Sequence, residues 1–439
     1  MKTIIILITK FITFLGNILN RGTTLPGKIA LKLDKNILGK LKLPENIIVV
    51  TGSSGKGSTT KTITEVLRNL NYTVVYNDNG GNIINGICTH LIKNCTLSGK
   101  IKSDYIVLEA DERYCKILFK YVTPKYLIIT NVTRDQPPRQ GHFDIVFNDI
   151  IKELSPKTKL VLNADDPYLQ KLNGDITYYG INKNNFSYTE EKFSVLNYIY
   201  CPHCNTKLNY NYYHFENIGN YYCPNCEFKR PNPKIEITDI DYENNTLTLN
   251  KEFKISTNTK ILYSIYNILA AATLLNELGI NLKDICTNIS KIKQNKKLYE
   301  QITNNNQNYY ILNNKCENAT TFNQSLLFVD KQTEKMTIVI GWMEISRRYP
   351  YNDLSWLYDV EFEILKNKDI EKIICVGPQR YDLSVRIKNA GINKDKIVEL
   401  ENPIVACNYI KSEIKENVYA ILNFDYVKPF VENLGGQND

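Results

Sequence analysis

The chain has 439 residues, too many for one ordinary hydrophobic core, so its length predicts about two to four domains. With 43% hydrophobic and 23% charged residues it has the composition of a globular protein. A net charge of +8 over this length favours anionic partners but gives no reason to expect nucleic-acid binding. Length and composition therefore exclude a single-domain protein and indicate a multidomain globular one.

The N-terminal residues 1–16 form an apolar run that looks at first like a signal peptide. Lys10 interrupts the run, no small-residue cleavage site follows, and the run is far shorter than the ~20 residues of a membrane span. It predicts a helix that packs on the protein or lies along a membrane surface. With the short helical segment that follows, it makes up an N-terminal helical segment at residues 1–45.

A phosphate-binding turn follows the first predicted strand. Apolar residues 47–50 predict a buried strand, and residues 61–70 an amphipathic helix. Between them, glycines let the backbone approach an anion, a lysine adds positive charge, and a hydroxyl of Ser58 or Thr59 can bind Mg²⁺. A plain glycine-rich turn is the alternative. The residues that we expect to contact the nucleotide or its metal are Gly52, Ser53, Ser54, Gly55, Lys56, Gly57, Ser58 and Thr59.

From residue 47 onward, predicted strands and helices alternate. Short apolar runs at residues 74–76, 105–108, 126–130 and 159–162 lack polar alternation, as strands buried on both faces do. They predict an α/β fold with a central doubly wound parallel sheet, in a nucleotide-binding domain at residues 46–298 that includes a helix at residues 257–278. A second rhythm, with strands at residues 336–340, 372–376 and 419–422, predicts a C-terminal Rossmann-like α/β domain at residues 299–439.

A polar insertion at about residues 197–233 carries four of the eleven cysteines. They form two C-P-x-C pairs with the spacing of a tetrahedral four-thiolate zinc site, and a redox C-x-x-C pair is the competing interpretation. The insertion has few Lys or Arg residues, so we expect no nucleic acid as its partner. The other cysteines are scattered singly, as in a reducing cytoplasm. The predicted zinc ligands are Cys201, Cys204, Cys223 and Cys226.

Polar residues follow three of the predicted strands. Glu109 and Asp111 lie at the end of one strand, residues 131–136 follow the next, and residues 163–167 the one after. The carboxyl ends of parallel strands meet at one edge of a sheet, where ligands of open α/β sheets bind. A carboxylate there can hold Mg²⁺ against nucleotide phosphates. Three such turns beside a phosphate loop indicate a site.

Taken in chain order, these elements resemble the Mur ligase family, the ATP-dependent enzymes that join a carboxylate to an amine through an acyl phosphate. The resemblance covers nearly the whole chain. The four-cysteine insertion and residues 353–359 and 377–386 are similar to the branch that forms the ligase subunit of lipid II isoglutaminyl synthase. The motifs that carry the resemblance along the chain lie at residues 22–30, 52–59, 131–136, 163–167 and 266–271.

The resemblance implies roles for individual residues. Lys56 and its loop are expected to bind the phosphates of ATP, and Glu109 to bind Mg²⁺ and serve catalysis. Asn267 is expected to meet the adenine, and Asp135 and Asp165 to shape the same pocket. The implied cofactors are thus ATP and Mg²⁺, beside the Zn²⁺ of the insertion.

The resemblance also implies a reaction. ATP would activate the α-carboxyl of D-glutamate in lipid II or a related lipid-linked wall precursor, and ammonia from a GatD-type glutamine amidotransferase subunit would leave D-isoglutamine. Such an enzyme is expected in the cytoplasm or at the inner face of the membrane. A folylpolyglutamate-synthase-like or amino-acid-adding Mur ligase is an alternative, as is a zinc-containing scaffold that binds ATP without turnover.

Asp353 is the second predicted catalytic residue. A glutaminase with only a Cys and a His lacks the group that orients the His, and a partner's carboxylate can supply it. Near Asp353 lie Trp356 and Tyr358, aromatic residues of the kind enriched at interfaces. We therefore expect Asp353 to reach the partner's active site. The alternative is an aspartate that caps a helix, with Trp356 in the core.

Overall fold

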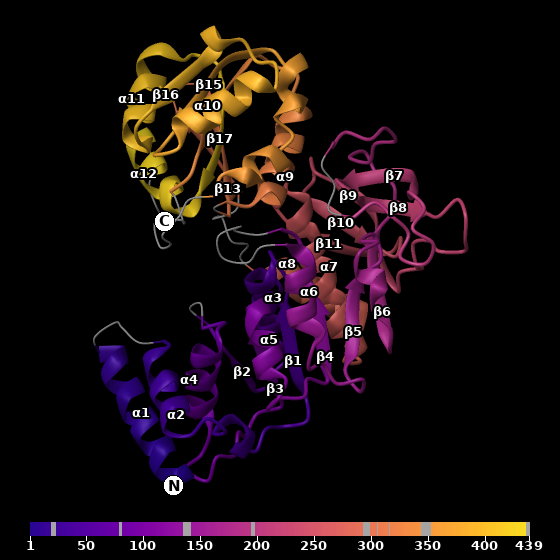
Figure 1. Cartoon of the computed structure of the whole chain (residues 1–439), viewed down its shortest axis with the longest axis vertical. Helices are drawn as coiled ribbons and strands as arrows, with labels where there is room; N and C mark the ends of the chain where they lie inside the picture. Colours follow the sequence, from indigo (N-terminus) through magenta and orange to yellow (C-terminus); the bar gives the residue numbers. More distant parts are fainter. Residues whose placement is uncertain are drawn as a thin grey trace.

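The structure is a computed structural model that describes residues 1–18, 23–78, 81–134, 142–194, 198–292, 299–304, 306–315, 317–343 and 353–435. The described residues form a large central sheet, a second sheet nearer the C-terminus, a two-stranded sheet and an N-terminal helical layer (Figure 1). No helix in these ranges is long and apolar enough to cross a membrane. Short 3₁₀ helices lie at Leu38–Lys40, Leu169–Lys171, Ser355–Asp359 (η4), Phe362–Asn367 and Lys394–Lys396.

The central sheet has nine strands. Seven of its strands, β2, β3, β1, β4, β5, β6 and β9 in spatial order, pair parallel with one another. At the other edge, β10 pairs antiparallel with β9 and with β11. The predicted doubly wound sheet is confirmed, and its antiparallel edge was not predicted. The spatial order is β11 (Phe253–Ser256), β10 (Thr246–Leu249), β9 (Ile235–Asp241), β6 (Ile176–Ile181), β5 (Lys159–Asn163), β4 (Tyr126–Ile129), β1 (Ile47–Thr51), β3 (Tyr105–Glu109) and β2 (Val74–Tyr76).

Helices cover both faces of this sheet, and β1 shows why. Ile47 and Val49 pack into one hydrophobic core, and Ile48 and Val50 into the other, so the strand is buried on both sides. One core includes α4 (Ile84–Asn94), α5 (Glu112–Leu118) and α6 (Phe143–Ile151). The other includes α3 (Lys56–Asn69), α7 (Leu262–Glu277) and α8 (Leu282–Lys291). The helix α7 starts later than the predicted residue 257.

The second sheet has six strands, of which β12 and β13 pair antiparallel and the others parallel. Its order is β12 (Tyr299–Asn304), β13 (Gln307–Asn314), β17 (Asn417–Asn423), β14 (Met336–Gly341), β15 (Ile370–Val376) and β16 (Ile397–Leu400). Cores on its two faces include α9 (Ala319–Asp330) and α10 (Arg380–Asn389) on one side, α11 (Pro403–Glu413) and α12 (Phe424–Leu434) on the other.

The N-terminal helices α1 (Lys2–Ile18) and α2 (Leu25–Leu33) pack against α4. Gly27 makes this approach close, because its N–H donates to Thr89 Oγ1 at 2.8 Å and a Cβ there would lie 1.9 Å from Asn85 O. The predicted helix at the start of the chain is therefore present and packed on the protein along one face.

The strands β7 (Asn209–Phe215) and β8 (Ile218–Tyr222) form a hairpin within the predicted insertion. The hairpin lies over the carboxyl end of β5, where Gly219 N–H donates to Asp165 O at 2.9 Å and Tyr221 donates to Ala164 O at 3.1 Å. The insertion thus forms one wall above the edge of the sheet at which the predicted site residues lie.

Candidate functional site

The phosphate loop connects β1 to α3 with the backbone that its glycines predict. Gly52 and Gly55 have φ angles of 127° and 85°. A Cβ at Gly52 would lie 2.3 Å from Thr130 Oγ1, and one at Gly55 would lie 2.1 Å from Asn267 Oδ1. Only glycine therefore lets the loop pass between the ends of β4 and α7.

Ser53 and Ser54 attach the loop to the segment that follows β4. The N–H of Ser53 donates to Asn131 O at 2.9 Å, and the N–H of Ser54 donates to Asn131 Oδ1 at 3.0 Å. Both amides thus bind Asn131, whereas we expected from the sequence that they would face the phosphates. The first turn of α3, which begins at Lys56, instead presents N–H groups that make no intrahelical bond.

A backbone carbonyl and a carboxylate are among the partners that hold Lys56 at the start of α3. Its Nζ donates to Gly52 O and lies 2.9 Å from Glu112 Oε1, in the first turn of α5. Only 11% of the Lys56 side chain and 1% of the Glu112 side chain are exposed. Glu112 was not singled out from the sequence. This ion pair fixes a positive charge beside the amides that can bind phosphate.

Glu109 ends β3 and lies beside the same helix start. Asn82 Nδ2 donates to Glu109 Oε1 at 2.9 Å. A Cβ at Gly57 would lie 3.2 Å from Glu109 Oε2, so a glycine lets the carboxylate approach the first turn of α3. Ser58 is partly exposed there, whereas Thr59 is buried. Of the two predicted hydroxyls, Ser58 is therefore the one that could share a Mg²⁺ ion with Glu109.

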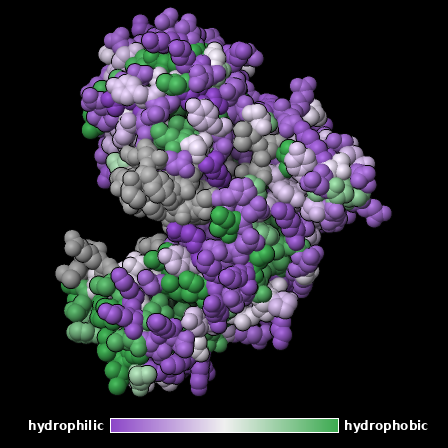
Figure 2. Space-filling model, in the orientation of Figure 1, coloured by the Kyte–Doolittle hydropathy of each residue, from purple (hydrophilic) through white to green (hydrophobic). Residues whose placement is uncertain are grey.

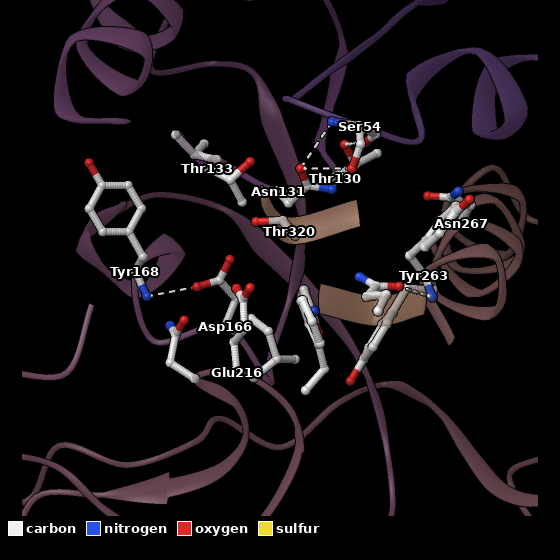
Figure 3. A pocket seen from close by; sticks show the side chains of 17 residues that line it. Ser54, Thr130, Asn131, Thr133, Asp166, Tyr168, Glu216, Tyr263, Asn267 and Thr320 are labelled. Atoms are coloured by element: carbon white, nitrogen blue, oxygen red, sulfur yellow. Dashed lines mark hydrogen bonds between the residues drawn. The ribbon is translucent and has the colours of Figure 1, made fainter. Parts of the chain in front are cut away.

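A cavity lies beside the loop, between the ends of β4 and β5, the start of α7 and the β7–β8 hairpin (Figure 3). Asn267 lines it and is 5% exposed, and its Nδ2 has no hydrogen-bond partner among the described residues. Thr133 Oγ1 is a second buried polar atom of the lining without one within those ranges. Unpaired buried polar groups are costly, so both atoms are suited to bind a polar ligand.

Asp165 does not line this cavity, contrary to the expectation from the sequence. It is fully buried, its Oδ1 accepts from Arg230 Nε at 2.6 Å, and its Oδ2 accepts from Tyr266 at 2.7 Å. Both carboxylate oxygens are thus used to hold α7 and the end of the insertion together. The next residue, Asp166, faces the cavity instead. Asp135 lies outside the described residues.

Two carboxyl groups lie together in the cavity wall, those of Asp166 and Glu216 (Figure 3). Glu216 stands in the β7–β8 turn with a φ angle of 44°. Burial raises the pKa of Asp166 to about 7 and that of Glu216 to about 8, although Asn323 donates to Glu216 Oε1 at 2.8 Å and opposes the latter shift. Neither acid was singled out from the sequence. Near neutral pH such groups can accept a hydrogen bond or, when protonated, donate one.

Two cations connect the second sheet to the phosphate-loop region. Lys315, which follows β13, donates from Nζ to Ser53 O at 2.8 Å. Arg134, which follows β4, forms an ion pair of 2.8 Å with Asp359 Oδ2. Lys315 was not singled out from the sequence. Both contacts bring the second sheet against the candidate ATP site.

Asp353 lies outside the cavity, just before η4. Its Oδ1 accepts from the N–H of Ser355 at 2.9 Å, which is a local capping interaction. Trp356 is 1% exposed and packs on Trp342, with ring centroids 4.9 Å apart. The prediction that Trp356 is an interface anchor is therefore wrong, and its alternative place in the core is observed. Tyr358 is 61% exposed. Whether Asp353 reaches a partner stays a prediction.

The four patterned cysteines come together in the insertion, with their sulfur atoms all within 4.8 Å of one another. The Sγ atoms of Cys201 and Cys226 are 3.5 Å apart, and those of Cys204 and Cys223 are 3.4 Å apart. A tetrahedral Zn²⁺ with Zn–S bonds of ~2.3 Å needs sulfur atoms about 3.8 Å apart. The cluster therefore fits a metal ion of this size, and its four thiolates leave no open position for a substrate.

Comparison with known proteins defines the class of this chain. Residues 50–275 match the Mur ligase middle domain, and the chain belongs to the Mur ligase family. Within that family it belongs to the MurT group, because a MurT protein is 33% identical over 95% of this chain and residues 316–426 match the MurT ligase C-terminal domain. The resemblance read from the sequence is confirmed.

Relatives that match nearly the whole chain include two MurT proteins. The "Lipid II isoglutaminyl synthase (glutamine-hydrolyzing) subunit MurT" of Staphylococcus aureus (strain COL) is 33% identical over 95% of both chains. The protein of the same name from Streptococcus pneumoniae (strain ATCC BAA-255 / R6) is 28% identical over 95% of this chain and 94% of its own.

Solved structures show the same fold. A pseudomurein peptide ligase type C from Methanothermus fervidus aligns with a TM-score of 0.69 at 20% identity, over 91% of this chain and 80% of that one. The MurF ligase from Thermotoga maritima in complex with ADP aligns with a TM-score of 0.61 at 15% identity, over 93% and 84% of the two chains. At these identities the likeness is one of fold.

Proposed function

We propose that this chain is the ligase subunit of a glutamine-dependent amidotransferase that acts on lipid II or a related lipid-linked cell-wall precursor. Its reaction converts the α-carboxyl of the D-glutamate residue to the amide of D-isoglutamine at the expense of ATP. The two MurT relatives, which carry the name of a lipid II isoglutaminyl synthase subunit over 95% of this chain, support the assignment.

One structural observation carries the proposal: Glu109, Gly57 and Lys56 meet at the start of α3. The Glu109 carboxylate lies against the turn whose amides can bind phosphate, because a Cβ at Gly57 would be only 3.2 Å from Glu109 Oε2. Lys56 supplies positive charge at the same place. A site for a nucleoside triphosphate and its Mg²⁺ requires this combination of a carboxylate, a positive charge and free-standing backbone amides.

The chemistry follows from this arrangement. A carboxylate oxygen of the substrate attacks the γ-phosphorus of ATP, the bond from phosphorus to the leaving ADP oxygen breaks, and an acyl phosphate forms. Ammonia then attacks the acyl carbon, phosphate leaves with the bonding electron pair, and the nitrogen loses a proton. Lys56 and the amides of α3 neutralise charge on the phosphates, so positioning and electrostatics suffice and no protein nucleophile is needed.

Partner, metal and location belong to the same proposal. The relatives' printed name calls them a subunit of a glutamine-hydrolysing enzyme, so we assign ammonia supply to a separate GatD-type glutaminase. The four-cysteine cluster would hold a structural Zn²⁺ that folds the insertion. The chain would act in the cytoplasm, at the inner face of the membrane that carries its lipid-linked substrate.

The test is reconstitution with a GatD-type partner, ATP, Mg²⁺, glutamine and lipid II. We expect ADP release that depends on the carboxylate substrate. We also expect the mass of the product to show that the hydroxyl of the substrate carboxyl group has been replaced by an amino group. ATP binding without turnover would instead support a scaffold, and turnover that requires an amino acid in place of ammonia would support an amino-acid-adding ligase.

Variants of the metal-binding corner sharpen the test. Glu109→Ala should abolish ATP hydrolysis. Gly57→Ala should raise the Mg²⁺ concentration needed for half-maximal rate, because its Cβ would displace the Glu109 carboxylate from 3.2 Å. Gly39→Ala is the matched control, because its Cβ would make an ordinary 3.4 Å contact with Tyr121. Wild-type turnover by Glu109→Ala would remove the site assignment.

A further inference from the structure

The outer face of α1 carries an apolar stripe that the described residues leave uncovered. Four of its members are more than half exposed: Ile4 at 61%, Phe11 and Phe14 at 62%, and Ile18 at 65%. They are separated by seven, three and four residues, which is the spacing of side chains along one side of a helix. The complete stripe, which is exposed along the whole length of α1, is Ile4, Leu7, Ile8, Phe11, Phe14, Leu15 and Ile18.

The opposite face of α1 already has its partners. Ile5 and Ile6 are buried in the central core cluster. Lys2 Nζ donates to Ser98 O at 2.8 Å, and Lys10 Nζ donates to Lys93 O at 2.7 Å. The helix is therefore docked in a fixed orientation, and the stripe is not needed to fold it. An apolar surface of this kind marks an interaction site.

The neighbouring helix α2 also exposes apolar side chains. Leu25 and Leu33 are 53% and 51% exposed. Lys28 and Lys32, also exposed, lie between them at helical spacing. In the space-filling view, apolar surface gathers over the N-terminal helices, at the lower left (Figure 2). Apolar and basic side chains thus share one surface at one end of the molecule.

Charge is concentrated in the same part of the chain. Residues 1–45 contain eight Lys and Arg but only two acidic residues, so about one tenth of the chain holds +6 of its net charge of +8. A basic helix with a bulky apolar face is the pattern of segments that lie in the headgroup region of an anionic bilayer. A second copy of this chain would bring another N-terminal segment with a net charge of +6 close to the first, which opposes self-association.

We propose that the outer surface of α1 and α2 binds the surface of an anionic lipid bilayer, with α1 lying in the plane of the membrane. The apolar stripe enters the boundary between headgroups and acyl chains, and Lys28 and Lys32 bind anionic headgroups. The link between this surface and a lipid-linked substrate rests on the proposed function. The binding itself does not, and it is measured without turnover.

The test is flotation of the full chain with vesicles of phosphatidylcholine, with and without phosphatidylglycerol. We expect the chain to float with the anionic vesicles, to do so less at high salt, and to bind the neutral vesicles at least ~10-fold more weakly. Phe11→Glu/Phe14→Glu should lose binding to anionic vesicles by a similar factor. Phe424→Glu is the matched control, because Phe424 is 61% exposed on α12 and should leave vesicle binding unchanged.

The other possible outcomes show either that something else binds the apolar stripe or that nothing does. Equal flotation of wild type and Phe11→Glu/Phe14→Glu would overturn the proposal, as would no flotation of the wild type. A dimer in light scattering that this variant dissociates would assign the stripe to a second copy. Circular dichroism and the unfolding temperature establish that the variant is folded, which is expected since both side chains are exposed. If the chain binds vesicles but shows no amidation of lipid II, the proposed function fails and the membrane surface stands.

Discussion

Lys56 and Glu112 form a buried ion pair, with Nζ 2.9 Å from Oε1, that joins the phosphate loop to α5. Removing two charges from water costs free energy that their attraction offsets only when the geometry is good. A pair of this kind is therefore retained for position: the carboxylate fixes where the ammonium of Lys56 lies. Glu112 is in this sense a positioning residue for the phosphate site.

Replacing Glu112 by Gln should destabilise the protein and weaken ATP use. Because one charge of a buried pair is left uncompensated, the free energy of unfolding should fall by about 3 kcal/mol. The KM for ATP should rise several-fold, because Lys56 loses the carboxylate that fixes its ammonium group and keeps the weaker contact with Gly52 O. The double variant Lys56→Met/Glu112→Leu should recover most of the stability but remain inactive. Urea unfolding and ATP hydrolysis measure the two effects.

Glu65→Gln is the control for this prediction. Glu65 pairs with Lys61 at 3.5 Å on the exposed side of α3, where both side chains are at least one-third exposed. An exposed pair contributes about 0.5 kcal/mol, so stability and KM should stay close to wild type. If Glu112→Gln behaved like Glu65→Gln, the buried pair would have no positioning role.

Chelation of the metal, or Cys201→Ser/Cys223→Ser, should remove about one zinc per chain and unfold the insertion. Because the turn between β7 and β8 lines the cavity beside the phosphate loop, loss of zinc should also weaken ATP binding. Elemental analysis and nucleotide titration measure both. Cys286→Ser changes a buried cysteine of α8 outside the cluster and should keep the zinc. A metal-free insertion that kept its fold would contradict the prediction.

The elements near the phosphate loop could be predicted because their signals are local. The strand, the glycines and the helix start at residues 47–60 lie next to one another in the sequence, and each glycine is needed for a contact that the structure shows. The two cysteine pairs likewise carry their spacing within the motif. Such features depend on the backbone geometry of a few consecutive residues, and the identity of those residues determines that geometry.

The rest of the site depends on packing between distant segments. Glu112 meets a lysine 56 positions away, and Glu216 reaches the cavity only because the hairpin turns with a positive φ angle. Asp165 and Asp166 look alike in sequence, and the turn after β5 decides that the second faces the cavity. An aromatic residue such as Trp356 has the same appearance in a core as at an interface, so the sequence did not separate the two.

Stability should fall as pH rises through neutrality because of Glu216. Its pKa is 4.5 in the unfolded chain and about 8 in the folded protein. Between these values the folded state holds a proton that the unfolded state has lost, so the contribution of Glu216 to stability is largest below pH 4.5 and declines until about pH 8. Asp166 contributes in the same direction up to about pH 7.

Glu216→Gln tests this dependence, because a Gln oxygen can still accept from Asn323 but does not titrate. Its unfolding midpoint should vary less with pH than that of wild type between pH 5 and pH 8, a window inside the shift of Glu216 from 4.5 to about 8. Glu227→Gln, an exposed position of the same insertion, should leave the wild-type slope unchanged. Identical slopes for wild type and Glu216→Gln would show that Glu216 does not carry the proton.

Replacing Asp353 by Asn should separate the use of glutamine from the use of ammonia. If Asp353 orients the histidine of a partner glutaminase, the neutral amide keeps the size of the side chain and its acceptor for the Ser355 N–H, but loses the charge that stabilises the imidazolium. Glutamine-driven amidation should then drop by at least ~100-fold, with external ammonia used at the wild-type rate and the complex still assembled. Asp382→Asn, at an exposed position of α10, should leave both activities intact. Equal glutamine-driven rates for wild type and Asp353→Asn would leave Asp353 with its local capping role alone, and an equal loss with ammonia would assign it to the ligase site.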